Sequence, residues 1–291
     1  MEKMNIICFG FGQVAKNFIK KINSENVKIN LTVTSREKSE RKNFDGLAYE
    51  RLQFSENFFD KKLIENLKSS NHILISIAPV SGEDIVIKNF KSIFDNSKIK
   101  WITYLSATSV YGNHNGDWVD ENSKTNPTST NGIDRLSAEK SWLSLAERNN
   151  LPLQILRLSG IYSNQNNILT RLKEGNTKII NKKNQFFSRI HVEDISNILF
   201  KSLQNFKAKE IYNVSDDKPA STEEVILYGS KLLNTKKPET VELVSIKSEM
   251  VKNFYKDSKK VDNKKMKEFF NYKLKYPTYV EGLNYIHNNT I

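Results

Sequence analysis

The 291-residue chain contains a single cysteine, Cys8, so it cannot form a disulfide bond within itself. Long apolar runs are also missing, since no stretch approaches the roughly 18 residues that a membrane span needs. The first residues lead into a short apolar run without the basic and apolar regions of a secretory signal. These absences predict a cytoplasmic protein in which Cys8 is buried and inert. The four histidines lie far apart along the chain, and we expect no metal site.

Positive charge is in excess, and the formal net charge is +12. Lysines supply most of it and are spread along the chain, whereas arginine, the better reader of phosphates and base edges, is sparse. The densest basic stretch, 252–267, also contains Asp257 and Asp262 and has helix-like spacing. We therefore expect solvated basic faces rather than a nucleic-acid or membrane partner. The predicted partner is a small-molecule substrate, and the protein is expected to be a monomer or a homodimer.

The strongest local signal is a glycine-rich turn near the N-terminus. An apolar run at 4–9 is followed by Gly10-Phe11-Gly12-Gln13-Val14-Ala15 and then by a helix-like segment. In a dinucleotide-binding turn the first glycine permits the tight bend, and the second leaves room for a pyrophosphate. The diphosphate lies at the helix N-terminus, where unpaired N–H groups favour an anion. The alternative is an ordinary strand–helix turn. The pattern predicts that the cofactor-binding residues include Gly10, Gly12, Gln13, Val14 and Ala15.

Apolar strand-like runs alternate with amphipathic segments over most of the chain. This alternation predicts an α/β fold, a Rossmann-type doubly wound parallel sheet with helices on both faces. Beyond residue 214 the pattern changes, and Ser221 or Thr222 before Glu224 indicates a capped helix. The expected strands are 5–9, 28–34, 72–78, 100–106, 153–158, 211–214 and 241–244; the expected helices are 12–23, 60–69, 84–92, 133–149, 221–233, 262–270 and 279–287.

The change of pattern also suggests a division into domains. We expect an NAD(P)-binding domain over 1–160, completed by about 186–215. Residues 161–185 and 216–291 are expected to form a smaller, substrate-binding lobe. Ligands bind beyond the carboxyl ends of the strands in open α/β sheets, so the lobe would lie over that edge.

The residues after the second expected strand bear on the choice of cofactor. An NAD-selective site usually places an acidic residue there, which accepts a hydrogen bond from the ribose 2′-hydroxyl. No Asp or Glu stands at this strand end; Ser35 and Arg36 can instead meet a 2′-phosphate. The nearby Glu37 slightly weakens this interpretation. We predict NADP as the cofactor, with NAD possible; the alternative is a solvent-exposed loop arginine in an NAD or dual-specificity site.

Several motifs follow in order: Tyr-Leu-Ser-Ala-Thr-Ser-Val-Tyr-Gly at 104–112, Leu-Arg-Leu-Ser-Gly-Ile-Tyr at 156–162, Arg-Ile-His-Val-Glu-Asp-Ile at 189–195 and Ile-Tyr-Asn-Val at 211–214. With them the sequence resembles extended short-chain dehydrogenases/reductases over nearly its whole length. A more specific resemblance is to an atypical branch, the NAD(P)-dependent epimerase/dehydratase-like proteins of the bacterial YeeZ type. It implies an NAD(P)-binding oxidoreductase or epimerase that acts on a small polar metabolite.

The catalytic Ser-Tyr-Lys triad of that family is missing where its pattern would place it. Ala107 stands at the Ser position, Asn131 at the Tyr position and Arg135 at the Lys position. Asparagine cannot transfer a proton, and arginine stays charged, although Arg135 can still donate to ribose hydroxyls. The resemblance therefore implies cofactor binding without the usual proton relay. A non-catalytic NADP(H)-binding sensor or scaffold stays open as the alternative to an enzyme.

The other candidate residues also follow from the resemblance. Thr108, Tyr111 and His191 are the candidate catalytic groups, although in the family this Tyr mostly packs and this His is commonly structural. Arg189 would suit a carboxylate or phosphate of the substrate, or would form a structural ion pair. The candidate substrate-binding residues are Ser106, Thr108, Trp118 and Arg189; the further residues expected at the cofactor are Ala78, Pro79, Ala107, Arg135, Ser159 and Gly160.

Overall fold

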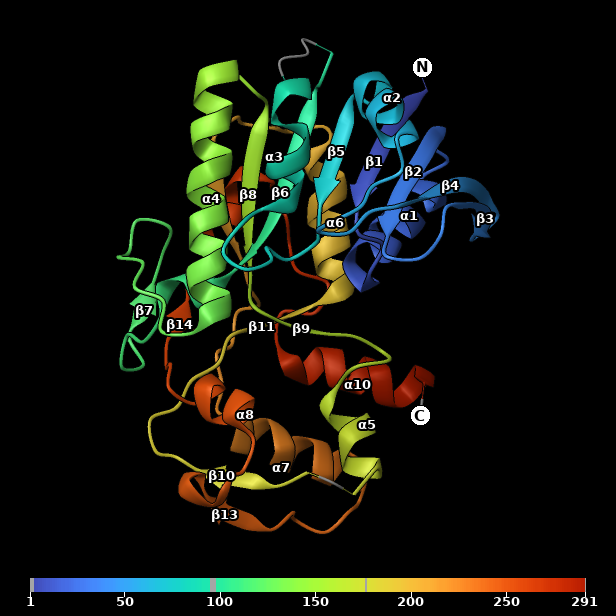
Figure 1. Ribbon diagram of the computed structural model, residues 1–291. Helices are drawn as coiled ribbons and strands as arrows, with labels where there is room; N and C mark the ends of the chain where they lie inside the picture. Colours follow the sequence, from blue (N-terminus) through green and yellow to red (C-terminus); the bar gives the residue numbers. More distant parts are fainter. Residues whose placement is uncertain (1–2, 95–97, 176, 291) are drawn as a thin grey trace. The chain divides into compact units, whose positions relative to one another are not determined.

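The computed structural model describes residues 3–94, 98–175 and 177–290, which fall into two compact units (Figure 1). Unit 1 comprises Met1–Ala107, Ile133–Arg157 and Ile195–Tyr212, and unit 2 comprises Thr108–Gly132, Leu158–Asp194 and Asn213–Ile291. The domain boundaries expected from the sequence stay a prediction. Within the described ranges, no helix is both long and apolar enough to cross a bilayer.

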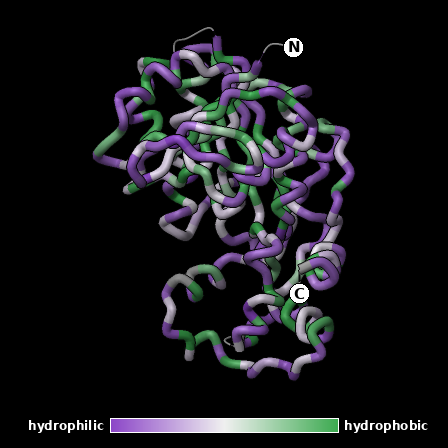
Figure 2. Tube along the Cα trace, turned by 90° about the vertical axis from the view of Figure 1, so that its right-hand side faces the viewer, coloured by the Kyte–Doolittle hydropathy of each residue, from purple (hydrophilic) through white to green (hydrophobic). Residues whose placement is uncertain are grey.

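An eight-stranded, mostly parallel sheet lies largely in unit 1, and this confirms the predicted Rossmann-type α/β fold. The central strands are buried on both faces, which explains their nearly continuous apolar sequences. Figure 2 shows green, apolar segments among these strands. In spatial order the strands are β12 (Glu210–Val214), β8 (Leu153–Leu158), β6 (Trp101–Ala107), β5 (His72–Ile75), β1 (Met4–Phe9), β2 (Ile29–Ser35), β4 (Leu47–Gln53) and β3 (Glu40–Phe44).

Helices cover both faces of this sheet. On one face α2 (Lys62–Ser69), α3 (Ile85–Phe90) and α4 (Thr130–Asn149) bury apolar side chains against β1, β5, β6 and β8. On the other face α1 (Gln13–Ser24) stacks Phe18 on Trp101 of β6, and the indole N–H of Trp101 donates to Ser202 at the end of α6 (Val192–Ser202). Because these strands run parallel, their carboxyl ends lie at one edge of the sheet. The helix α1 begins at this edge, since it directly follows β1.

Unit 2 is built from short elements. Its helices α5 (Ile168–Lys173), α7 (Thr222–Leu232) and α10 (Tyr279–Thr290) share an apolar core. The Ser221 hydroxyl accepts from the Glu224 N–H at 3.0 Å, which confirms the predicted helix cap. Unit 2 also contains α8 (Glu249–Phe254), α9 (Lys264–Phe269) and 3-10 turns at Thr108–Tyr111 and Leu243–Ser245. Its short strands form three parallel pairs, β9 (Gly160–Tyr162) with β11 (Arg189–His191), β7 (Trp118–Val119) with β14 (Lys260–Val261) and β10 (Ile179–Asn181) with β13 (Thr240–Glu242).

The elements differ from the sequence-based expectation in a few places. The strand expected at 72–78 ends at Ile75, and the helix expected at 84–92 ends at Phe90, where a 3-10 turn begins. The β3–β4 hairpin and α6 were not expected. β3 is a polar, exposed edge strand without an apolar face, so its sequence carries no strand periodicity.

Candidate cofactor and substrate sites

The first glycine of the turn after β1 has a conformation and surroundings that only glycine tolerates. Gly10 has φ +89°, and a Cβ there would lie 2.8 Å from both the Ile77 Cγ2 and the Ser76 Oγ. The Gly10 N–H donates to the Thr34 hydroxyl of β2 at 2.9 Å. Gly10 thus lets the turn pass against the carboxyl end of β5, just before Ala78 and Pro79.

The second glycine leaves an open space at the start of a helix. Gly12 is the N-cap of α1, and a Cβ built on it would meet no atom within 4 Å. No side chain caps the helix, and its first turn carries no acidic residue. Gln13 is exposed, whereas Val14 and Ala15 are buried against the sheet. An open glycine beside uncapped N–H groups fits the diphosphate of a dinucleotide.

The β3–β4 hairpin supports this turn from the side. The ring of Phe11, between the two glycines, lies 5.2 Å from the rings of both Phe44 in β3 and Tyr49 in β4. These aromatic contacts add packing to the hydrogen bonds that hold the turn. The sequence analysis missed this contribution because it did not identify the hairpin.

The loop after β2 holds the residues predicted to choose between NAD and NADP. The Ser35 hydroxyl accepts from the Glu37 N–H at 3.2 Å, and the carbonyl oxygen of Arg36 accepts from Gln53 Nε2 at 3.2 Å. The Arg36 side chain is exposed. The Glu37 carboxylate pairs with Arg51 of β4.

The carboxyl end of β6 lies beside Arg135 of α4. The Arg135 guanidinium donates to the Leu105 carbonyl oxygen at 2.7 Å, and the side chain is half-buried. Ser106 is buried, and its hydroxyl has no hydrogen-bond partner among the described residues; Ala107 follows it, half-buried. Unit 1 therefore brings Ala107 and Arg135 to the same strand end, while Asn131 is an exposed residue of unit 2.

In unit 2, three segments of the chain meet at one residue, Asn213. The buried Tyr111 hydroxyl donates to Asn213 Oδ1 at 2.7 Å, and the Asn213 N–H donates to Glu121 Oε1 at 2.7 Å. Burial raises the pKa of Glu121. Tyr111 is thus held in a buried network, while Thr108 at the start of the same 3-10 turn is half-buried.

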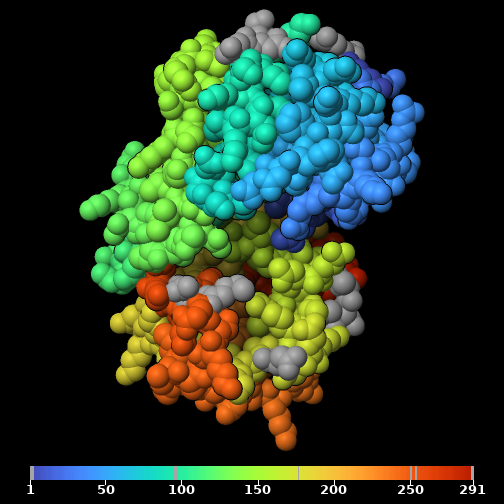
Figure 3. Space-filling view, viewed as in Figure 1, coloured from blue at the N-terminus to red at the C-terminus, as the bar shows by residue number. Residues whose placement is uncertain are grey.

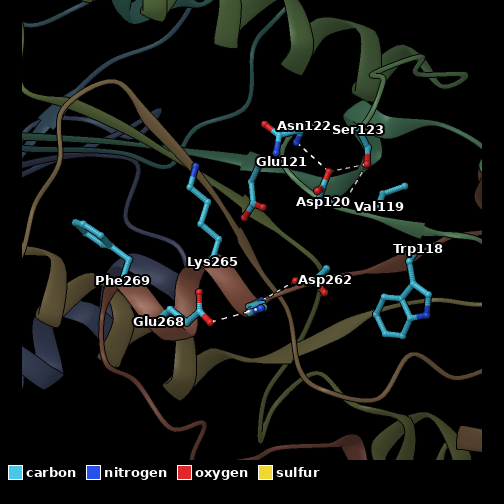
Figure 4. Close-up of a pocket in the computed structure, with 11 residues that line it drawn as sticks. Trp118, Val119, Asp120, Glu121, Asn122, Ser123, Asp262, Lys265, Glu268 and Phe269 are labelled. Carbon is cyan, nitrogen blue, oxygen red and sulfur yellow. Dashed lines mark hydrogen bonds and ion pairs between the residues drawn. The ribbon is translucent and has the colours of Figure 1, made fainter.

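The cavity beside Trp118 lies entirely within unit 2 (Figure 4). It has a volume of about 690 Å³, and the Trp118 side chain is exposed. In Figure 4 the side chains of Glu121 and Lys265 point toward each other across it. The lining residues are Trp118, Val119, Asp120, Glu121, Asn122, Ser123, Asp262, Lys264, Lys265, Glu268 and Phe269.

Arg189 makes contacts to the main chain of its own unit. Its Nη1 donates to the carbonyl oxygens of Phe187 at 2.9 Å and Ala220 at 3.0 Å. Burial disfavours the charged form of both Arg189 and the nearby Asp216. It therefore lowers the pKa of Arg189 and raises the pKa of the Asp216 carboxyl. In the neighbouring segment the Ser159 N–H donates to the Val214 carbonyl at 3.0 Å, and the Gly160 N–H donates to the Ser188 carbonyl at 3.1 Å.

His191 is enclosed by aromatic rings. Its ring centroid lies 5.0 Å from that of Tyr162 and 4.2 Å from that of Tyr276, and the side chain is completely buried. The Glu193 N–H donates to His191 Nδ1 at 3.3 Å, and Nε2 has no partner among the described residues. Burial lowers the pKa of His191 to about 4, so the imidazole is neutral near pH 7. No group of three His, Cys, Asp or Glu side chains in the described ranges could hold a metal ion.

Comparisons with known proteins agree with this geometry. The family model described as NAD dependent epimerase/dehydratase family matches residues 88–215. A solved structure, that of a functionally unknown conserved protein from Silicibacter pomeroyi DSS, is 32% identical, with 98% of each chain covered and a TM-score of 0.86. The chain belongs to the NAD-dependent epimerase/dehydratase family. This membership confirms the expected resemblance to extended short-chain dehydrogenases/reductases.

More distant members of the family share the fold. A dTDP-glucose 4,6-dehydratase from Bacillus anthracis str. Ames, solved with NAD, is 18% identical over 98% of this chain and 96% of its own, with a TM-score of 0.77. A UDP-glucuronic acid 4-epimerase from Bacillus cereus, also solved with NAD, is 15% identical over 98% of this chain and 99% of its own, with a TM-score of 0.76. No curated protein matches the sequence of the chain.

Proposed function

We propose that this member of the family is an NAD(P)-dependent oxidoreductase or epimerase that acts on a small polar metabolite without a Ser-Tyr-Lys triad. The observation that carries the proposal is the turn after β1, where Gly12 leaves open space beside the uncapped start of α1. The nicotinamide ring supplies the hydride acceptor or donor when the cofactor is bound. Ala107, at the carboxyl end of β6, is proposed to border it.

NADP is the proposed cofactor. The end of β2 carries Ser35 and Arg36 in place of an acidic residue, and the exposed guanidinium of Arg36 suits a 2′-phosphate. Arg135, half-buried at the end of β6, is proposed to donate to the ribose hydroxyls while its contact to the Leu105 carbonyl holds it in place.

The substrate and the proton donor belong to unit 2 and to the end of β6 in this proposal. Ser106, Thr108, Trp118 and Arg189 are the proposed substrate contacts. Of the candidate catalytic groups, the Tyr111 hydroxyl donates a hydrogen bond to Asn213 and His191 is buried among aromatic rings, so we propose Thr108 or water as the proton donor. Solved structures with the same fold hold UDP-glucuronic acid together with NAD, or NAD alone, and this supports a polar substrate here.

A non-catalytic NADP(H)-binding sensor or scaffold is the second candidate. It is favoured by the replacement of all three catalytic residues, by Ala107, Asn131 and Arg135. Reduction of any carbonyl substrate with NADPH, in a screen of small polar aldehydes and ketones, separates the two candidates. An enzyme turns over at least one of them, whereas a sensor binds NADPH and leaves it unoxidised.

The glycine turn offers the direct test of cofactor binding. We expect wild type to bind NADPH in a fluorescence titration and Gly12→Val to bind neither dinucleotide, because a branched side chain would occupy the approach of the pyrophosphate. The variant should fold, since Gly12 has an ordinary φ of −80° and open surroundings. Its circular dichroism spectrum is the control. Binding that survives in a folded Gly12→Val would reject this turn as the phosphate site.

A further inference from the structure

The loop that follows β2 is tied to β4 along its whole length. Gln53 donates from its side chain to the Arg36 carbonyl at 3.2 Å and from its N–H to the Ser39 hydroxyl at 3.0 Å. Arg51 Nη2 donates to the Lys38 carbonyl at 3.2 Å. The same hairpin packs on Phe11 of the glycine turn. The loop that carries Ser35 and Arg36 is therefore built into the sheet edge, as Figures 1 and 3 show for the blue hairpin residues at the surface of unit 1.

Arg51 is the centre of this arrangement. Its side chain is only 12% exposed although it projects from a strand near the sheet edge, and its two terminal nitrogens pair with Glu37 and Glu40. A guanidinium that is largely removed from water needs such carboxylate partners. Glu37 is 70% exposed, so it contacts Arg51 from the solvent side and is not itself buried.

This pairing decides which charges the loop presents. Glu37 is the acidic residue nearest the end of β2, and its carboxylate is engaged by Arg51. The guanidinium of its neighbour Arg36 forms no ion pair with any described residue. The Arg36 guanidinium is therefore available to a ligand, whereas the Glu37 carboxylate is engaged by Arg51. In a dinucleotide-binding fold, the end of the second strand is where the adenosine ribose binds.

We propose that Arg51 is a specificity-determining positioning residue, which holds Glu37 against β4 and thereby leaves Arg36 to bind a 2′-phosphate. The inference rests on the proposed NADP-binding function. Without Arg51, the Glu37 carboxylate can pair with Arg36, repel the 2′-phosphate and accept a hydrogen bond from a ribose 2′-hydroxyl. All three effects move the preference from NADPH toward NADH.

The test is a set of fluorescence titrations with NADPH and NADH, and the readout is the ratio of the two dissociation constants. Arg51→Gln should lower the preference for NADPH about tenfold, the size expected for an unshielded like charge near the phosphate. Glu37→Gln should change the ratio by less than about twofold, because the carboxylate is already neutralised. Arg51→Gln combined with Glu37→Gln should restore the ratio to within about twofold of wild type, because the carboxylate next to Arg36 is gone and Glu40 keeps its ion pair with Lys42. Arg41→Gln, an exposed arginine of β3, is the control and should leave the ratio unchanged.

If Arg51 had only a structural role, Arg51→Gln would weaken the binding of both cofactors equally and leave the ratio of dissociation constants unchanged. This result overturns the inference. So does a double variant whose ratio does not return toward that of wild type. If Arg51→Gln does not fold, Arg51→Lys carries the test: an ammonium lacks the fork that holds two carboxylates, and the ratio should fall about threefold. An unchanged ratio in Arg51→Lys also overturns it. A wild type that binds neither dinucleotide refutes the proposed function together with this inference, whereas a wild type that prefers NADPH with an unchanged ratio in Arg51→Gln refutes the role of Arg51 alone.

Discussion

The guanidinium of Arg157 in β8 forms a buried, two-pronged ion pair with the carboxylate of Glu139 in α4. Nε donates to Oε1 at 3.1 Å and Nη2 donates to Oε2 at 2.7 Å, and the two side chains are 5% and 1% exposed. Glu139 lies one helical turn beyond Arg135, so the two point to the same side of α4. The ion pair therefore fixes the part of α4 that brings Arg135 to the end of β6.

Removing one partner of this pair should destabilise the protein strongly. Glu139→Gln is expected to lower the free energy of unfolding by about 3–5 kcal/mol, because it leaves the Arg157 charge buried without its counter-charge. Urea denaturation of wild type and variant measures the loss. The matched control is Glu147→Gln in the same helix, whose exposed pair with Lys209 should be worth less than about 1 kcal/mol. Similar losses in the free energy of unfolding in both variants would show that the buried ion pair stabilises the protein no more than the exposed one.

The buried strands could be predicted because each is apolar on both faces. The turn at Gly10 and Gly12 could be predicted because its pattern is a short continuous run of residues. The β3–β4 hairpin was missed because Glu40–Phe44 is polar, although the Asp45-Gly46 turn between the strands, with positive φ at both residues, is a typical hairpin signal. The helix α6 was missed although its signal was present: Ile195, Ile198 and Leu199 are buried at helical spacing.

The site divides in the same way. The candidate residues at the turn and at the end of β2 could be proposed from the sequence, because each directly follows an apolar strand. The junction of Tyr111, Glu121 and Asn213 could not, because the contacts of Asn213 join segments about 90 to 100 residues apart. The pairing of Glu37 with Arg51 likewise depends on the hairpin, which the sequence analysis did not identify.

Arg36 should carry much of the preference for NADPH. A charge-assisted contact to the 2′-phosphate is worth on the order of 1.5–3 kcal/mol, so Arg36→Ala should weaken NADPH binding roughly 10- to 100-fold and NADH binding much less. Lys38→Ala, two residues along the same exposed loop, is the control for a general loss of positive charge. Equal affinity of wild type for both cofactors in a fluorescence titration, or an Arg36→Ala variant that keeps its NADPH affinity, would contradict the assignment.

His191 should make stability fall in mild acid. Its pKa is about 4 in the folded protein, below the ordinary value near 6.5, so the unfolded state binds more protons between these pH values. Its contribution to the free energy of unfolding is full above pH 6.5 and should fall by about 2 kcal/mol between pH 7 and pH 5. The buried carboxyls Asp194 and Asp216 have raised pKa values and act in the opposite direction. The informative measurement is therefore the difference in pH slope between wild type and His191→Gln in urea denaturation, and identical slopes would rule out the buried neutral imidazole.

The usual proton relay of the family should be absent from this protein. Asn131 is exposed at the start of α4 and cannot transfer a proton, and Arg135 stays charged while it donates to the Leu105 carbonyl. Loss of a general acid typically costs about 10²–10⁴ in rate, so any carbonyl reduction should be slow or use another donor. Asn131→Ala should leave turnover of a substrate found in the screen nearly unchanged, and Arg135→Ala should mainly weaken NADPH binding in the fluorescence titration. Brisk turnover by wild type that Asn131→Ala abolishes, with NADPH binding retained, would show that Asn131 takes part in the chemistry and that the roles given to positions 131 and 135 are wrong.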